Sequence, residues 1–233
     1  MEVRILRPIL YEIAKTRAEA RHREYTIDIF HASELGGCPR AIYFKRMGLD
    51  RVEQRPINYF LLEDGTALHR RVQKDLEIAK VLIEKEKIVK EKLLGIQGHF
   101  DGVVNVDFIE AGNTVVSGEH VLLEIKTINK KGFAELYKPK RGHYIQGNFY
   151  AIRKKLKKIL FLYYCRDNGD TKEYLEDTSL TVYAETAAMI KRTKKYLLDK
   201  VTPTETSPDD CFFCPYMWFC KLEKETTKKC LVI

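Results

Sequence analysis

Three cysteines near the end of the sequence constrain the fold of this chain more than any other feature. They have the spacing Cys211-x2-Cys214-x5-Cys220, in which the CxxC pair places two thiolates close enough to bind one metal centre. A four-coordinate site needs one more ligand, and the best candidate is Cys38, which lies beside a glycine pair and a proline. A metal held by these four thiolates would join the two ends of the chain, so the residues between them must fold into a body whose ends meet.

The residues alone leave the occupant of this cysteine site open between zinc and an iron–sulfur cluster. An ordinary cysteine-containing loop is the alternative without a metal. Aromatic side chains around the three cysteines would exclude water, which suits an iron–sulfur centre. These side chains are Phe212, Phe213, Tyr216, Trp218 and Phe219. Cys165 lies instead in an apolar strand pattern and is predicted to be a buried thiol of the core.

The charge balance of the chain indicates a polyanionic partner. Its 233 residues include 41 Lys and Arg against 33 Asp and Glu, a formal net charge of +8, which favours nucleic acid over a membrane. A solvated surface with surplus lysine is the alternative. The first residues carry charges throughout, unlike a signal peptide, and the most apolar run, 159–165, is too short to span a bilayer. We therefore expect a soluble, cytoplasmic protein with no membrane partner.

The order of patterns along the chain predicts an α/β domain. Helices, a run of short strands, a helix, a strand and a further helix follow one another before the cysteine-rich tail. The predicted ranges are 64–80 (helix), 83–126 (strands), 139–155 (helix), 157–167 (strand) and 181–200 (helix). Within the run of strands, Gly112-Asn113 and Ser117-Gly118 predict turns.

Two acidic residues and a lysine in the predicted sheet form a candidate catalytic site. Glu124 and Lys126 are two positions apart on one strand and therefore share one side of the sheet. If Asp101 lies at the end of the adjoining strand, its carboxylate and that of Glu124 meet at one point and suit Mg²⁺ or Mn²⁺. Such a site can hydrolyse phosphodiesters, with the lysine beside the attacking water. The alternative is a surface aspartate and an edge-strand ExK, a combination common by chance.

Three further residues are candidates for the same site. His69 projects from the preceding helix and is a third potential metal ligand, although a lone histidine on such a face is more often a core residue. Gln146 and Tyr150 are four positions apart on one helical face, next to a basic helix end. This placement suits contacts to a phosphate backbone, and a core position is the alternative for Tyr150.

Together, in this order, these motifs resemble one known family. The motifs are Cys38-Pro-Arg, His69 in GTALHRRVQ, Asp101 in GHFDG, Glu124-x-Lys126, Gln146-x3-Tyr150 and Cys211-x2-Cys214-x5-Cys220. They are similar to those of RecB-like PD-(D/E)xK exonucleases with an iron–sulfur cluster. The likeness is greatest to the CRISPR-associated protein four family and its viral and stand-alone archaeal relatives, and it spans about residues 33–220.

The resemblance implies a restriction-endonuclease-like core, with a mixed central sheet flanked by helices and a cysteine-rich appendage that joins the N- and C-terminal segments. Residues 1–60 would be a helical segment that supplies one cluster ligand, 61–200 the nuclease core, and 201–233 the cluster-binding segment. His69, Asp101, Glu124 and the backbone carbonyl of Ile125 would hold the Mg²⁺ or Mn²⁺, with Lys126 as the catalytic lysine. The family pattern has a loose proline before the first acidic residue, where this chain has Phe100 preceded by His99.

The resemblance also assigns roles to the remaining motifs. Gln146 and Tyr150 would position the substrate. Cys38, Cys211, Cys214 and Cys220 would bind a [4Fe–4S] cluster, with zinc as the alternative occupant. The expected activity is digestion of single-stranded DNA from an end, with internal nicking as a second activity.

The biological setting implied by the family is either CRISPR adaptation together with integrase proteins, or DNA processing by a viral protein in the host cytoplasm. The leading alternative from another class is a non-catalytic DNA-binding scaffold subunit with a structural metal site. A zinc-ribbon regulator is a third interpretation.

Overall fold

A computed structural model describes residues 6–20, 25–49, 56–110, 114–206, 211 and 214–221. The chain divides into two compact units. The sheet unit comprises His31–Gly36 and Leu62–Ala187. The cysteine unit comprises Met1–Phe30, Gly37–Leu61 and Ala188–Ile233, of which the ranges given above are described.

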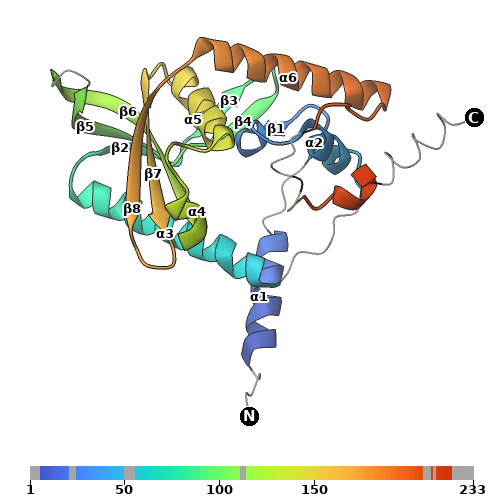
Figure 1. The fold of residues 1–233 in the computed structure, drawn as a ribbon, viewed down its shortest axis with the longest axis horizontal. Helices are drawn as coiled ribbons and strands as arrows, with labels where there is room; N and C mark the ends of the chain where they lie inside the picture. Colours follow the sequence, from blue (N-terminus) through green and yellow to red (C-terminus); the bar gives the residue numbers. More distant parts are fainter. Residues whose placement is uncertain are drawn as a thin grey trace, which may run out of the picture. The chain divides into compact units, whose positions relative to one another are not determined.

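The sheet unit is built on a mixed five-stranded sheet with the order β2-β5-β6-β7-β8 (Figure 1). Its strands are β2 (Leu82–Lys85), β5 (Gly102–Glu110), β6 (Thr114–Ile128), β7 (Lys158–Cys165) and β8 (Thr171–Asp177). β6 and β7 are parallel, and the other neighbouring pairs are antiparallel. A parallel pair requires a crossover, which contains α4 (Lys130–Ala134) and α5 (Arg141–Arg153). The prediction of a mixed sheet flanked by helices is therefore confirmed.

Helices cover both faces of this sheet because its central strands are apolar on both sides. On one face, Val72 and Leu76 of α3 (Pro56–Ile78) pack against a buried cluster that includes Leu123 and Ile125 of β6. On the other face, the backbone of α5 approaches β7 so closely that a Cβ on Gly147 would lie 3.0 Å from the Phe161 ring. Glu124 pairs with Phe161 in the register, so it belongs to the face that α5 covers.

A second, smaller sheet has the order β1-β4-β3. Its strands are β1 (Phe30–His31), β3 (Ile88–Glu91) and β4 (Ile96–His99), and a short 3₁₀ helix, η1 (Ala32–Glu34), follows β1. β3 and β4 pair antiparallel, with Ile88 opposite His99. The end of β4 leads through Phe100 and Asp101 directly into β5. This hairpin therefore places Asp101 immediately before the first residue of β5 in the main sheet.

The turn predicted at Ser117-Gly118 is wrong, because β6 continues through both residues. Gly118 has φ +70°, a conformation that glycine adopts without a Cβ penalty. Its N–H donates to the Asp107 carboxylate at 2.8 Å, where the β5–β6 register shifts. The glycine therefore forms an irregularity within a long strand. The turn predicted at Gly112-Asn113 lies outside the described residues.

A close backbone approach holds the start of α5 against the segment after η1. A Cβ added to Gly36 would lie 2.2 Å from the Cα of Gly142, a backbone atom that cannot rotate away. We expect Gly36→Ala to destabilise the protein by about 1–3 kcal/mol, the usual cost of overpacking. Gly65→Ala, in α3, is the matched control because the nearest atom would be 3.4 Å away. Urea unfolding checks both variants, and equal unfolding midpoints would contradict the close approach.

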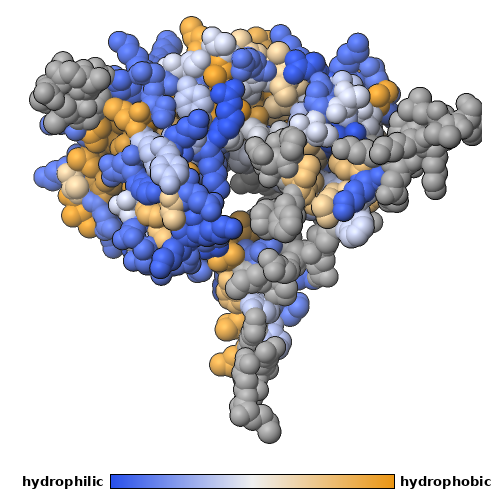
Figure 2. Space-filling view, viewed as in Figure 1, coloured by the Kyte–Doolittle hydropathy of each residue, from blue (hydrophilic) through white to orange (hydrophobic). Residues whose placement is uncertain are grey.

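The described part of the cysteine unit contains α1 (Leu6–Ala20), α2 (Pro39–Arg46) and the second half of α6 (Leu180–Asp199). Phe30, Phe44 and Tyr216 are buried in it, and Arg46 stacks over Phe30 while donating to the carbonyl of Ile29 at 2.8 Å. One side of α1 exposes apolar side chains, visible in orange in Figure 2. They are Leu6, Ile9, Leu10 and Ile13. Among the described helices, none combines the length and apolarity needed to cross a membrane.

Candidate active site

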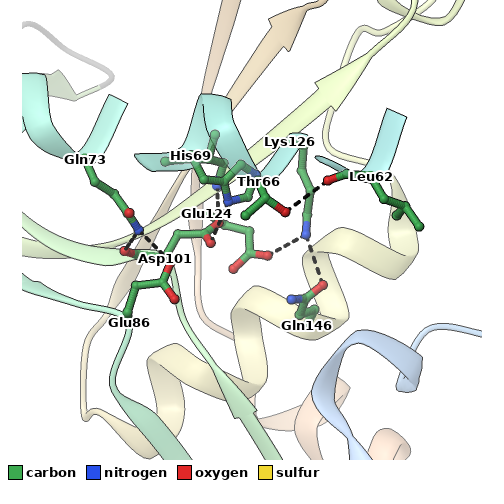
Figure 3. Close-up of polar contacts among 10 residues, drawn as sticks. Leu62, Thr66, His69, Gln73, Glu86, Asp101, Glu124, Lys126 and Gln146 are labelled. Atoms are coloured by element: carbon green, nitrogen blue, oxygen red, sulfur yellow. Dashed lines mark hydrogen bonds and ion pairs between the residues drawn. The ribbon is translucent and has the colours of Figure 1, made fainter. Parts of the chain in front are cut away.

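Asp101 is held in place by three groups at the start of β5 (Figure 3). Its Oδ2 accepts a hydrogen bond from the backbone N–H of Ile125 at 2.7 Å, which ties it to the neighbouring strand β6. Its Oδ1 lies 3.0 Å from Nδ1 of His69 on α3. Its backbone carbonyl accepts from Nε2 of Gln73, one helical turn after His69, at 2.8 Å. The structure therefore brings Asp101, His69 and the backbone of Ile125 together, although the contact to Ile125 is made by its N–H and not by the carbonyl expected to bind the metal.

Glu124 and Lys126 share one side of β6, as their spacing predicted, and α5 covers that side. Nζ of Lys126 is 2.6 Å from Oε1 of Glu124, and it also donates to Oε1 of Gln146 on α5 at 3.1 Å. Glu124 is only 1% exposed and Lys126 is 19% exposed, so this ion pair has little contact with water. Gln146 therefore meets the lysine directly, and the lysine cannot swing away without losing both partners.

Three ionisable groups of this site have shifted pKa values. Burial raises the pKa of Glu124 well above its ordinary value, and the charge of Lys126 offsets this only in part. Burial acts to lower the pKa of Lys126, but the carboxylates of Glu124 and Asp101 outweigh it, so that pKa is raised. Burial acts to lower the pKa of His69, but the hydrogen bond to Asp101 and the charges of Asp101 and Glu124 together outweigh it, so that pKa is also raised. In each case the raised pKa means that a proton is held more tightly close to a buried carboxylate.

One carboxylate oxygen in the site has no partner. Oε2 of Glu124 is buried and makes no hydrogen bond to any described residue. A buried carboxylate oxygen without a hydrogen bond is unfavourable, and a divalent cation would satisfy it. The carboxylate oxygens of Asp101 and Glu124 suit Mg²⁺ or Mn²⁺. Within the described ranges, however, no three His, Cys, Asp or Glu side chains already have the spacing of a metal site. A cation would replace the hydrogen bond between Asp101 and His69.

The structure places Tyr150 in the core. It is 2% exposed and packs against the rings of Phe100 and Phe149. A Cβ on Gly98 of β4 would lie 2.3 Å from the hydroxyl of Tyr150, so β4 passes directly over the tyrosine ring. Tyr150 therefore occupies the core position that was the alternative interpretation of the sequence. The role of Tyr150 in positioning the substrate stays a prediction. Phe100, which replaces the loose proline, is itself fully buried and supports the same core.

Two residues of this site are not predicted by the sequence analysis. Gln73 is 3% exposed and donates to both the Asp101 carbonyl and Oε1 of Glu86, at 2.8 and 3.1 Å. Its position four residues after His69 on the same helical face is the signal that could have identified it. Glu86 reaches the site from the turn between β2 and β3, with φ +52°.

In the cysteine unit, Cys38, Cys211 and Cys220 lie close enough to Cys214 to act on its thiol electrostatically. The pKa of the Cys214 thiol is raised by burial and further by the charges of Cys38, Cys211 and Cys220. Cys38 is the N-cap residue of α2, and Nε of Arg40 lies 3.3 Å from Sγ of Cys220. Residues from both ends of the chain therefore meet here. Phe212 and Phe213, predicted to shield a cluster, lie outside the described residues.

Comparisons with known proteins reveal a shared fold. No protein-family model matches this sequence, and no curated protein is detectably similar to it. Among solved structures, SSO0001 is similar with a TM-score of 0.58 at 16% identity, over 91% of this chain and 95% of that one. The alkaline exonuclease LHK-Exo from Laribacter hongkongensis is similar with a TM-score of 0.52 at 15% identity, over 75% of this chain and 90% of its own.

The same exonuclease in complex with dAMP gives a TM-score of 0.53 at 16% identity, over 76% of this chain and 90% of that one. At these identities the comparison concerns the fold. This chain has a mixed α/β fold similar to that of an alkaline exonuclease.

Proposed function

We propose that this protein is a divalent-metal-dependent DNA exonuclease that digests single-stranded DNA from an end. The observation that carries the proposal is the unpartnered, buried Oε2 of Glu124, next to the ion pair of Glu124 with Lys126 and close to Asp101. A buried acidic site that attracts a cation and presents a lysine is suited to phosphodiester hydrolysis. The fold shared with an alkaline exonuclease supports the same reaction class.

Each side chain has a distinct task in this proposal. Asp101, Glu124, His69 and the carbonyl of Ile125 would hold the Mg²⁺ or Mn²⁺. When bound, such an ion offsets phosphate charge and lowers the pKa of a water molecule. Lys126 remains protonated because Glu124 and Asp101 raise its pKa, so it donates hydrogen bonds to negative charge that develops on the phosphate. Gln146 fixes the lysine, and Gln73 fixes the backbone of Asp101.

The substrate and the second metal site complete the proposal. The net charge of +8 supports a DNA partner, and one solved relative in fold is an exonuclease in complex with dAMP. We further propose that Cys38, Cys211, Cys214 and Cys220 hold a [4Fe–4S] cluster, with zinc as the alternative occupant. Nε of Arg40 lies 3.3 Å from Sγ of Cys220, and a cation beside a thiol favours the thiolate form that binds a metal.

The proposed function is tested by incubating the protein and Mn²⁺ with linear single-stranded DNA labelled at its 5′ or 3′ end, and in parallel with circular single-stranded DNA. We expect progressive shortening of the linear strand from one end and much slower loss of the circle, with no reaction in excess chelator. DNA binding without any cleavage in Mn²⁺ or Mg²⁺ would contradict the proposal and support the non-catalytic scaffold instead.

A further inference from the structure

The imidazole of His143 borders the active site, and none of the roles proposed above uses it. It lies in the first turn of α5, three residues before Gln146 and on the same helical face. Gln146 contacts Lys126, and the charge of Lys126 acts on His143 electrostatically. The rings of His143 and Tyr163 stack, with centroids 5.7 Å apart. His143 is therefore a polar group beside the lysine that has no assigned function.

Tyr163 determines which nitrogen of His143 carries the proton. Tyr163 is completely buried, so water cannot accept its hydroxyl proton. Its oxygen accepts a hydrogen bond from the backbone N–H of Lys140 at 3.0 Å. Among the described residues, Nδ1 of His143, at 2.9 Å, is the one acceptor within hydrogen-bond distance of the hydroxyl. The hydroxyl therefore donates to Nδ1, and a neutral imidazole must carry its proton on Nε2.

The surroundings keep both groups in these states. Burial, followed by the charges of Lys126 and Lys140, lowers the pKa of His143 to about 3, so the ring is neutral at physiological pH. Burial raises the pKa of Tyr163 to about 12, so its hydroxyl keeps its proton. Nε2 of His143 makes no hydrogen bond within the described part of the chain, and it is not enclosed by protein. A fixed N–H donor therefore remains available beside Lys126.

We propose that the Nε2–H of His143 donates a hydrogen bond to a non-bridging phosphate oxygen of the DNA strand as it passes Lys126. The inference rests on the proposed function. Phosphate oxygens are acceptors only, so the tautomer that Tyr163 imposes is the one that can bind them. A neutral donor also avoids adding a cation beside Lys126 and the metal, where a charged imidazolium would be repelled. Tyr163 thus acts as a positioning residue through His143.

Two substitutions distinguish the role of Nδ1 of His143 from that of Nε2. His143→Gln keeps an N–H near the position of Nε2 and loses the acceptor for Tyr163. His143→Asn keeps an acceptor near the position of Nδ1 and loses the distal donor. We expect the Asn variant to bind single-stranded DNA about 10- to 100-fold more weakly, the usual effect of losing a hydrogen bond to a charged group. The Gln variant should stay within a few-fold of the parent. His120→Asn, at an exposed position of β6, is the matched control and should bind like the parent.

The experiment measures fluorescence anisotropy of a labelled single-stranded oligonucleotide with Ca²⁺ replacing Mn²⁺, and single-turnover cleavage with Mn²⁺. Nitrogen-15 NMR of the parent and of Tyr163→Phe reports the tautomer independently of activity. We expect the His143 proton on Nε2 in the parent and a mixture of tautomers in Tyr163→Phe.

Three results would each overturn the inference. They are equal DNA affinity of the Asn and Gln variants, a parent protein that does not bind DNA, and a His143 proton on Nδ1 in the parent. A parent that binds DNA and shows the expected variant ranking but does not cleave would instead overturn the proposed function alone. The two failures are therefore distinguishable.

Discussion

Replacing Glu124 by glutamine is expected to reduce the single-turnover rate of DNA cleavage by at least about 1,000-fold, since a catalytic metal contributes several kcal/mol. The side chain is buried, its Oε1 pairs with Lys126, and its Oε2 is the unpartnered oxygen. An amide keeps the shape of the side chain but is a weaker metal ligand and no longer pairs with the lysine charge. The loss should therefore appear in the chemical step, in reactions with either Mn²⁺ or Mg²⁺.

The matched control for this substitution is Glu173→Gln, on the exposed side of β8. It makes the same chemical change away from the site and should cleave like the parent. Both variants should retain the circular dichroism spectrum and cooperative melting of the parent. If the cleavage rate of Glu124→Gln is within a few-fold of that of Glu173→Gln, the prediction that the acidic residues are catalytic is wrong.

Replacing Cys38 by alanine is expected to lower the stability of the protein by about 4 kcal/mol or more. A metal that joins Cys38 to Cys211, Cys214 and Cys220 closes a loop of well over 100 residues, and closure of such a loop is worth about 4–5 kcal/mol in chain-entropy terms. Metal binding energy adds to this, because an unfolded chain has no preformed site. For a protein of this size, the melting temperature should fall by about 10 °C.

Cys165→Ala provides the control, because it removes a fully buried thiol from β7, in the sheet unit. It should cost about 1–2 kcal/mol as a small core truncation and leave the metal content unchanged. Iron, sulfide and zinc analysis, together with the visible absorbance of the parent, identifies the occupant. A Cys38→Ala variant that melts at the temperature of the parent would disprove the joining of the two ends by a metal.

The core of the candidate site could be predicted because its information is local. The two-residue spacing of Glu124 and Lys126 fixes their common face on any strand, and Asp101 follows a strand pattern in GHFDG. The continuous apolar run 159–165 similarly identifies β7 as a buried strand, and it correctly places Cys165 in the core. These features depend on local patterns, which the sequence displays directly.

Other residues of the site depend on long-range contacts that leave no local pattern. Glu86 reaches Gln73 from a tight turn with φ +52°, where glycine or asparagine would be the usual signal and neither is present. His143 acquires its fixed tautomer from Tyr163, twenty residues further on. Tyr150 faces the core because β4 passes over it, which its spacing from Gln146 does not indicate.

The edge strand β8 was missed for a different reason. Its sequence, TKEYLED, has two adjacent apolar residues, Tyr174 and Leu175, among charged ones, and adjacent residues of a strand point to opposite faces, so it has no clear apolar face. Charged residues are common on edge strands because they oppose pairing with other chains. The helix α3 also begins at Pro56, eight residues before the predicted start at 64, since the proline suits the first turn of a helix.

Anomalous scattering from Mn²⁺ in crystals of the protein, recorded at the manganese edge, tests the central claim most directly. A difference peak within bonding distance of Oε2 of Glu124 and a carboxylate oxygen of Asp101, lost in Glu124→Gln crystals, is the predicted result. Crystals that hold Mn²⁺ elsewhere while this position shows no peak would contradict the account.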